Sequence, residues 1–152
     1  MGNVSSPAGS GARVPDISVQ ETWLRLGADK EAVLIDVRTR AEWSFVGLPD
    51  LAEIGKPVLT VEWLTFPDSR PNAGFVERLR ELLDTAGTKK DAELFFICRS
   101  GARSRSAAEA MAAVGYTRCH NVADGFEGPL DGSSRRGRVA GWKAAGLPWG
   151  QG

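Results

Sequence analysis

The residues best suited to chemistry form one short segment that follows a run of large apolar side chains, residues 94–97. Its members are a cysteine and six small or basic residues: Cys98, Arg99, Ser100, Gly101, Ala102, Arg103 and Ser104. No acidic residue lies between Cys98 and Arg105, so this segment is cationic although the chain has 19 basic and 19 acidic residues. Cationic neighbours favour the thiolate form of a cysteine, which is its nucleophilic form. We therefore predict that Cys98 is a nucleophile.

Strands and helices are predicted to alternate around this segment. Buried strands are expected over residues 32–37, 58–61, 94–97 and 119–122, and a loop over residues 47–57. The first helix is expected from Ser18 to Leu26, with Gly27 ending it, and the second from a cap at Thr39 through Phe45. The third is expected from a cap at Asn72 through Leu83, and the fourth from Ser104 to about Gly115. Strands separated by helices pair in parallel through right-handed crossovers. The predicted fold class is therefore α/β.

This arrangement would place Cys98 where parallel sheets bind ligands. Ligands of open parallel sheets lie beyond the carboxyl ends of the strands, and Cys98 directly follows the third predicted strand. The amides of the loop and of the first helical turn lack helical acceptors, so they can converge on an anion. Gly101 is expected to permit a positive φ in this loop.

Length, charge and cysteine content exclude several classes of protein. A chain of 152 residues can bury a core as one domain, and two cysteines do not make a disulfide scaffold. No apolar stretch is longer than residues 94–98, which is far shorter than the roughly 18 residues of a membrane-spanning helix. Zero net charge argues against a nucleic-acid partner. Residues 1–14 are expected to be a disordered leader without a secretory signal, and the protein is expected in the cytoplasm.

These features resemble those of single-domain rhodaneses, which are sulfurtransferases. The resemblance covers residues 17–149 and rests on the order and spacing of three groups of residues. The first group is residues 34–38 with Glu42 and Trp43, and the second is residues 98–104. The third is residues 121–126 with Gly141, Trp142 and residues 146–148. It implies a rhodanese-like domain over residues 15–150, built as three layers with a small parallel sheet flanked by helices. In one departure, Gly47-Leu48-Pro49 lacks a histidine that many members carry there, which affects local packing rather than the nucleophile.

The resemblance also implies a reaction and its participants. The Cys98 thiolate would take the outer sulfur of an anionic donor such as thiosulfate, and a small or protein thiol, or cyanide in an assay, would accept it from the Cys98 persulfide. The N–H groups from Arg99 to Ser104 would stabilise the sulfur atoms, as an oxyanion hole does. Arg99 and Arg103 would orient the donor, while Ser100, Gly101 and Ala102 keep the rim small. No metal or organic cofactor is implied.

Other roles for these residues stay open. Asp36, Arg38 and Glu42 could form an acid/base set, but an ion-pair network that braces the loop from the neighbouring strand end is favoured. Cys98 could instead be a buried core cysteine, and the enzyme interpretation requires that its sulfur is not sealed from solvent. A non-catalytic module of the same fold is the second functional candidate.

A phosphatase or arsenate reductase is the third candidate. A cysteine-dependent phosphatase needs an arginine six positions after its nucleophile, and this position is Ser104, so that function is disfavoured. Cys119 is predicted to be structural, and His120 structural or exposed. Arg135, Arg136 and Arg138 are predicted to lie in a solvated loop.

Overall fold

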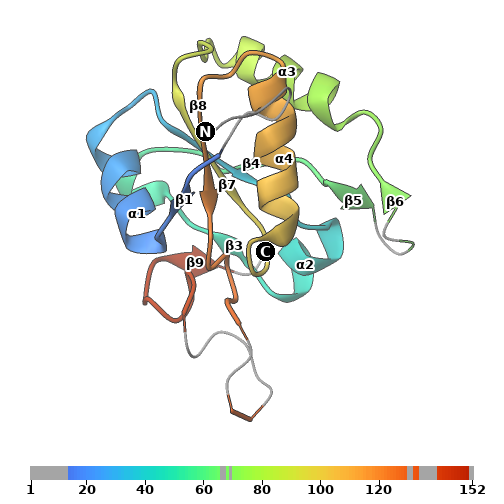
Figure 1. Cartoon of the computed structure of the whole chain (residues 1–152). Helices are drawn as coiled ribbons and strands as arrows, with labels where there is room; N and C mark the ends of the chain where they lie inside the picture. Colours follow the sequence, from blue (N-terminus) through green and yellow to red (C-terminus); the bar gives the residue numbers. More distant parts are fainter. Residues whose placement is uncertain (1–13, 66–67, 69, 130–131, 134–139, 151–152) are drawn as a thin grey trace, which may run out of the picture.

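Five strands pair in parallel to form the sheet at the centre of the molecule (Figure 1). The computed structural model describes residues 14–65, 68, 70–129, 132–133 and 140–150. The strands stand side by side in the order β1 (Asp16–Ile17), β8 (Arg118–Val122), β7 (Glu93–Ile97), β2 (Val33–Asp36) and β4 (Leu59–Thr60). The predicted α/β class and parallel pairing are confirmed.

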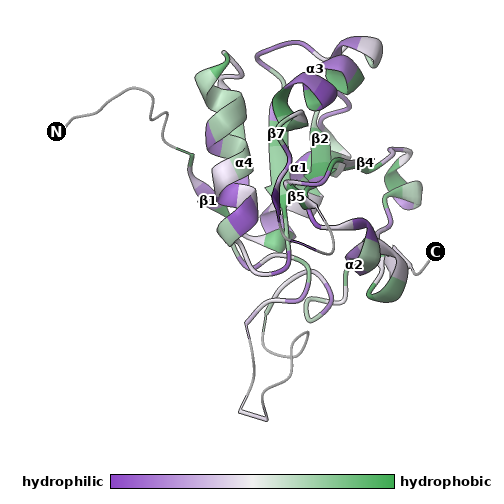
Figure 2. Cartoon of the chain, turned by 90° about the vertical axis from the view of Figure 1, so that its right-hand side faces the viewer, coloured by the Kyte–Doolittle hydropathy of each residue, from purple (hydrophilic) through white to green (hydrophobic). Residues whose placement is uncertain are grey.

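Helices cover both faces of this sheet, so the predicted three layers are confirmed (Figure 1). The helices are α1 (Val19–Ala28), α2 (Arg40–Phe45), α3 (Phe75–Thr85) and α4 (Ala102–Ala113). Side chains alternate between the two faces of a strand. Phe95 of β7 packs in the cluster on the α1 face with Leu26, whereas Phe96 and Cys98 pack in the cluster on the α3 and α4 face with Ala107. Figure 2 shows β7 and β2 largely in the hydrophobic colour.

The predicted N-caps of the first two helices are confirmed. The Ser18 side chain accepts a hydrogen bond from the Glu21 N–H at 3.0 Å, which satisfies one of the unpaired donors at the start of α1. Thr39 and Glu42 form a capping box at the start of α2, with each side chain bonded to the backbone of the other residue. These local bonds fix where both helices begin.

Three other predicted helix boundaries are wrong. Gly27 lies inside α1, which ends at Ala28. Gly74 is the N-cap of α3, because the Asn72 side chain accepts from the Gly74 N–H and forms a turn ahead of the helix. The last helix, α4, starts at Ala102 rather than Ser104, because Gly101 turns the chain into the helix with a φ of 111°.

The predicted loop over residues 47–57 is in fact partly ordered into regular structure. It holds β3 (Leu48–Pro49) and a short 3₁₀ helix, Ala52–Ile54. Strand β3 pairs antiparallel with β9 (Trp149–Gly150), which attaches the closing segment of the chain beside α2. A second antiparallel pair joins β5 (Leu64–Thr65) to β6 (Arg70–Pro71). Strands of two residues are too short for a periodic sequence pattern, so sequence analysis cannot detect them.

Two sequence predictions concern residues that lie largely outside those that the structure describes. Arg135, Arg136 and Arg138 lie outside the described residues, and so does the predicted leader apart from Val14. Val14 is buried and packs in the core cluster that contains Phe96. Within the described part of the chain, no helix has the length and apolar character to cross a membrane.

Trp142 anchors the closing segment and provides a test of this packing. Its ring is fully buried and its Nε1 donates to the Pro148 carbonyl at 2.6 Å, while Trp23 packs against it edge-on at 6.0 Å. We expect Trp142→Ala to lower the free energy of unfolding by about 3–5 kcal/mol in urea titrations, because it leaves a large cavity. Leu24→Ala, at a side chain that is 64% exposed, should change it by less than about 0.5 kcal/mol. Equal effects of the two variants would contradict this packing.

Candidate active site

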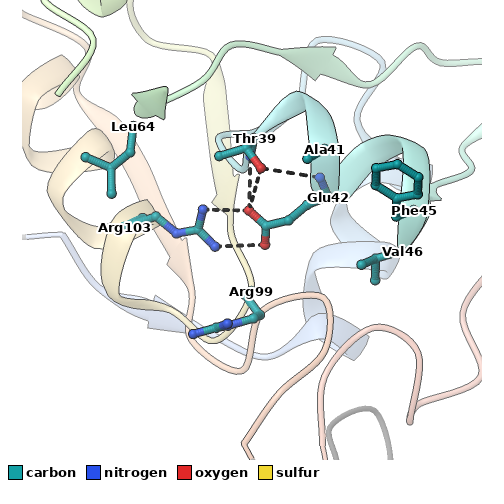
Figure 3. A pocket seen from close by; sticks show the side chains of 8 residues that line it. All are labelled: Thr39, Ala41, Glu42, Phe45, Val46, Leu64, Arg99 and Arg103. Atoms are coloured by element: carbon teal, nitrogen blue, oxygen red, sulfur yellow. Dashed lines mark hydrogen bonds and ion pairs between the residues drawn. The ribbon is translucent and has the colours of Figure 1, made fainter. Parts of the chain in front are cut away.

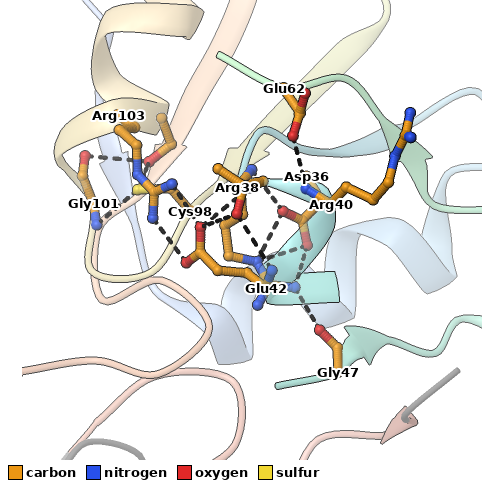
Figure 4. Close-up of polar contacts among 11 residues, drawn as sticks. Asp36, Arg38, Arg40, Glu42, Gly47, Glu62, Cys98, Gly101 and Arg103 are labelled. Atoms are coloured by element: carbon orange, nitrogen blue, oxygen red, sulfur yellow. Dashed lines mark hydrogen bonds and ion pairs between the residues drawn. The ribbon is translucent and has the colours of Figure 1, made fainter. Parts of the chain in front are cut away.

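Cys98 lies at the carboxyl end of β7, the middle strand of the sheet, where the chain turns into α4 (Figure 4). The Gly101 N–H donates a hydrogen bond to Cys98 Sγ at 3.1 Å. The Ser104 hydroxyl oxygen lies 3.2 Å from the same sulfur. The N–H groups of the first turn of α4 have no acceptor within the helix, and the helix dipole adds partial positive charge there. The sulfur therefore lies in a loop that presents hydrogen-bond donors.

Two glycines give this loop its path. Gly101 has a φ of 111°, and a Cβ atom there would overlap the carbonyl oxygen of Ala123 after β8. Gly125 has a φ of 69°, and a Cβ atom there would overlap the carbonyl groups of Cys98 and Arg99. The Phe126 N–H donates to the Cys98 carbonyl at 2.8 Å, so the segment after β8 also holds the loop by hydrogen bonds. The loop geometry thus requires glycine at both positions.

Cys98 is buried, with 1% of its surface exposed. The open sulfur that the enzyme interpretation requires is therefore not present in this conformation. Three residues of the same loop, Arg99, Ser100 and Ala102, are exposed.

A chain of polar contacts runs from the sulfur to the surface. Ser104 is fully buried, and its hydroxyl donates to Asn121 Oδ1 on β8 at 2.5 Å. Asn121 Nδ2 donates to Asp16 on β1 at 3.0 Å, and Arg105 of α4 pairs with the same carboxylate. No role was predicted for Asn121, Asp16 or Arg105 from the sequence. The usable signal was an asparagine inside a predicted strand.

The predicted network of charged residues braces the loop from β2 and α2. Arg38 and Asp36 are both fully buried and form a pair with Nη2 and Oδ2 at 2.6 Å. Arg38 also donates to the Gly47 carbonyl at 2.7 Å and lies over the Phe126 ring, 4.3 Å from its centroid. These contacts connect the end of β2 to the segments on both sides of the loop.

Glu42 reaches across to the first turn of α4 (Figure 3). It accepts two hydrogen bonds from Arg103, at 2.7 and 3.0 Å, which is a bidentate pair. Burial favours a higher pKa of Glu42, but the hydrogen bonds and charge of Arg103 outweigh it, so this pKa lies below its ordinary value. Arg103, which we predicted to orient a donor, is thus held by Glu42.

A cleft of about 520 Å³ opens beside the loop (Figure 3). Its polar lining comes from Thr39, Glu42, Arg99 and Arg103, and its apolar lining from Ala41, Phe45, Val46 and Leu64. Arg99 has no ion pair among the described residues, so it is the cation of this cleft that remains available to an anion. The cleft reaches the residue next to Cys98 but not Cys98 itself.

Cys119 and His120 lie apart from this arrangement. Cys119 on β8 is buried, and burial raises the pKa of its thiol to about 12. His120 stacks on Phe95, with 5.0 Å between the ring centroids, and its Nε2 lies 3.0 Å from Glu93. Burial outweighs the attraction of Glu93 and lowers the pKa of His120 below its ordinary value. Both residues occupy structural positions. In the part of the chain that is described, no three His, Cys, Asp or Glu residues are grouped as metal ligands would be.

Comparisons with known proteins agree with this fold. The family model of the STR4 middle domain matches residues 15–152. The crystal structure of Rv0390 from M. tuberculosis has a TM-score of 0.83 and 44% sequence identity, with 93% of this chain and all of that chain covered. A polysulfide-sulfur transferase from Wolinella succinogenes shares the fold at 19% identity and a TM-score of 0.56, over 91% of this chain and 80% of that chain.

Curated sequences give the same assignment. An uncharacterized protein of Rickettsia conorii is 36% identical over 136 residues, which is 90% of this chain and 97% of that protein. Rhodanese-like domain-containing protein 4, chloroplastic, of Arabidopsis thaliana is 27% identical over 133 residues, which is 87% of this chain but 25% of that longer protein. This chain therefore belongs to the STR4 middle domain family and is a rhodanese-like domain.

Proposed function

We propose that this protein is a sulfurtransferase that moves a sulfane sulfur from thiosulfate, or from another persulfide donor, to a thiol through a persulfide on Cys98. The observation that carries the proposal is the position of the Cys98 sulfur. It lies at the carboxyl end of the central strand and accepts the Gly101 N–H at the entrance to α4. Donors aimed at a sulfur stabilise the negative charge that both steps of such a transfer place on it.

The two steps balance without a cofactor. In the first, the Cys98 thiolate attacks the outer sulfur of thiosulfate, an S–S bond forms, and sulfite leaves with the electron pair of the bond that breaks. In the second, an acceptor thiolate, or cyanide in an assay, attacks the outer sulfur of the persulfide, and the Cys98 thiolate leaves. Helix amides from Ala102 to Ser104, which lack acceptors within α4, suit the terminal sulfur of the persulfide.

Arg99 is the residue we assign to the anionic donor. It lines the cleft, is exposed, and has no ion pair among the described residues, whereas Arg103 is bound by Glu42. Arg103 then acts through its bidentate bond to Glu42, which fixes the first turn of α4. Two free cysteines suit a reducing compartment, so we retain the cytoplasm as the proposed location.

The burial of Cys98 favours a second candidate, a non-catalytic module that uses the same fold to bind a partner. Chemistry at a sulfur that is 1% exposed needs the rim at Arg99, Ser100 and Ala102 to move aside. A module needs no such movement. The third candidate, a phosphatase or arsenate reductase, stays disfavoured because Ser104 stands where a phosphate-binding arginine is required and bonds within the protein instead.

Incubation with thiosulfate separates these candidates. We expect the intact mass to increase by one sulfur atom, and cyanide or a thiol to remove it, because Cys98 stores the transferred sulfur. Cys98→Ser should show no gain, whereas Cys119→Ser should show the full gain, because the high pKa of buried Cys119 keeps it unreactive. Absence of a gain in the unmodified protein would support the non-catalytic module. Hydrolysis of an aryl phosphate without any gain would support the phosphatase.

Arg99→Ala tests the assignment of the donor site. We expect it to raise KM for thiosulfate by about three- to tenfold with a smaller change in kcat, because one exposed charge-assisted contact is lost. The increase should shrink as ionic strength rises. Arg78→Ala on α3, which removes the same charge far along the chain from the loop, is the matched control and should leave KM unchanged. Similar KM values for the Arg99 and Arg78 variants would remove Arg99 from the donor site.

Gly101→Ala tests the loop geometry. The strain of a positive φ should lower the free energy of unfolding by about 1–3 kcal/mol, and the overlap with the Ala123 carbonyl should displace the Gly101 amide from the sulfur. Persulfide formation, measured by mass, should then slow by at least about tenfold, since a preorganised donor is lost. The matched control is Gly55→Ala, which has a φ of 69° with no atom near the added Cβ. It should lose some stability but transfer sulfur normally, and an equal loss of transfer in both variants would contradict this role of Gly101.

A further inference from the structure

The Ser104 hydroxyl has one hydrogen and three acceptors within reach. Asn121 Oδ1 is 2.5 Å from Ser104 Oγ, whereas the Gly101 carbonyl oxygen and the Cys98 sulfur are both 3.2 Å away. The shortest contact takes the hydrogen, so Ser104 donates to Asn121. The lone pairs of Ser104 Oγ are then left to face Cys98.

The orientation of the Asn121 side chain is fixed from the outside of the fold. Asp16 can only accept a hydrogen bond when it is ionised, and Asn121 Nδ2 donates to it at 3.0 Å. Arg105 pairs with Asp16 and also donates to the Val14 carbonyl at 3.2 Å, which holds the carboxylate in place. With Nδ2 turned toward Asp16, Oδ1 must face Ser104. A flipped Asn121 amide would place two acceptors, Asn121 Oδ1 and the Asp16 carboxylate, against each other.

This order of donors has a consequence for the sulfur. A neutral Cys98 thiol can donate its S–H to a lone pair of Ser104 Oγ. Each hydrogen bond from Cys98 through Ser104 and Asn121 to Asp16 then has one donor and one acceptor. A Cys98 thiolate is repelled by the lone pair of Ser104 Oγ. This repulsion is removed only if the Ser104 hydroxyl turns away from Asn121 and donates to the sulfur. The turn leaves Oδ1 of Asn121, a residue that is 2% exposed, without its donor. The Ser104–Asn121 bond therefore opposes the Gly101 amide, which favours the ionised sulfur.

We propose that Asn121 is a positioning residue that, through Ser104, holds the resting Cys98 sulfur as a thiol and sets how readily it ionises. This deepens the proposed function, because the same sulfur carries the transferred atom. Ionisation needs one hydroxyl to turn rather than a rearrangement of the loop. A sulfur held as a thiol is less reactive toward oxidants than a thiolate.

The other charged groups around Cys98 stay constant in the test. Arg103 faces it from α4, the Asp36–Arg38 pair lies at the end of β2, and Glu42 of α2 is bonded to Arg103. Asp16 on β1 acts through Asn121. Variants at positions 121, 104 and 16 leave Arg103, Glu42 and the Asp36–Arg38 pair in place.

Alkylation of Cys98 by iodoacetamide, followed by peptide mass mapping across pH, tests the proposal without any sulfur donor. Asn121→Ala frees the Ser104 hydroxyl to turn to the sulfur, so alkylation at neutral pH should be about three- to tenfold faster and its rise with pH should begin at lower pH. Adding Ser104→Ala to this variant should remove the gain. Asp16→Ala, at an exposed carboxylate, should give a smaller gain in the same direction because Asn121 can then flip.

Cys119 provides an internal control, because it is buried on the same strand as Asn121 and should stay unmodified in every variant. Faster alkylation of both cysteines by the same factor at all pH values would mean that β8 has loosened, and would overturn the proposal. An unchanged pH profile of Cys98 alkylation in Asn121→Ala would also overturn the proposal. If Asn121→Ala does not fold, the same result in Asp16→Ala would overturn it. A shifted profile without persulfide formation would leave the proposal standing and overturn the sulfurtransferase function instead.

Discussion

The hydrogen bond from the Gly101 amide to the Cys98 sulfur is the contact from which the rest of the site follows. It requires the chain to reverse directly after a buried strand and to enter a helix at once, and a positive φ at Gly101 makes that path possible. The segment after β8 also has to lie close to this loop. Gly125 lets it lie against the carbonyl groups of Cys98 and Arg99, and the Phe126 N–H binds the first of these.

Two ion pairs support this loop. The Asp36–Arg38 pair is fully buried and ties β2 to the Gly47 carbonyl and to the Phe126 ring. Buried pairs of this kind add little net stability, and Arg38 Nη1 is buried without a hydrogen-bond partner among the described residues. Glu42 and Arg103 form the second pair, which joins α2 to α4. Among the described residues, Arg99 is the cation lining the cleft that has no ion pair, which is why we assign it to the anionic donor.

The burial of Cys98 changes how this site works. Cys98 is 1% exposed, so the proposed transfer of sulfur would require the neighbouring residues Arg99, Ser100 and Ala102 to move aside. The same burial strengthens each polar contact to the sulfur, because water does not compete for it. The chain from Ser104 through Asn121 to Asp16 then matters more than it would in an open cleft.

The sequence predicted the features that depend on a residue's own type or on near neighbours. The caps at Ser18 and Thr39 are of this kind, and so is the glycine turn at Gly101. Features that join distant segments were not predicted, since no local pattern encodes them. The bond between Ser104 and Asn121 spans 17 positions and that between Glu42 and Arg103 spans 61.

The exposure of Cys98 was also misjudged, because a small basic loop indicates an accessible thiol but not how closely the loop folds over it. Two-residue strands such as β3 and β9 were not predicted from the sequence for a different reason. Their pairing is decided by the packing of Trp149 against Phe126 and Gly47 rather than by alternation along the strand.

The most direct test of the central claim is to record the backbone amide signals of the loop by NMR before and after addition of thiosulfate. If the amides receive the transferred sulfur, the Gly101 signal and those of Ala102, Arg103 and Ser104 should shift together and return when cyanide removes the sulfur. Signals of α3 should stay in place. Unchanged loop amides in a protein that has gained a sulfur atom would contradict the account, because the sulfur would then be held somewhere else.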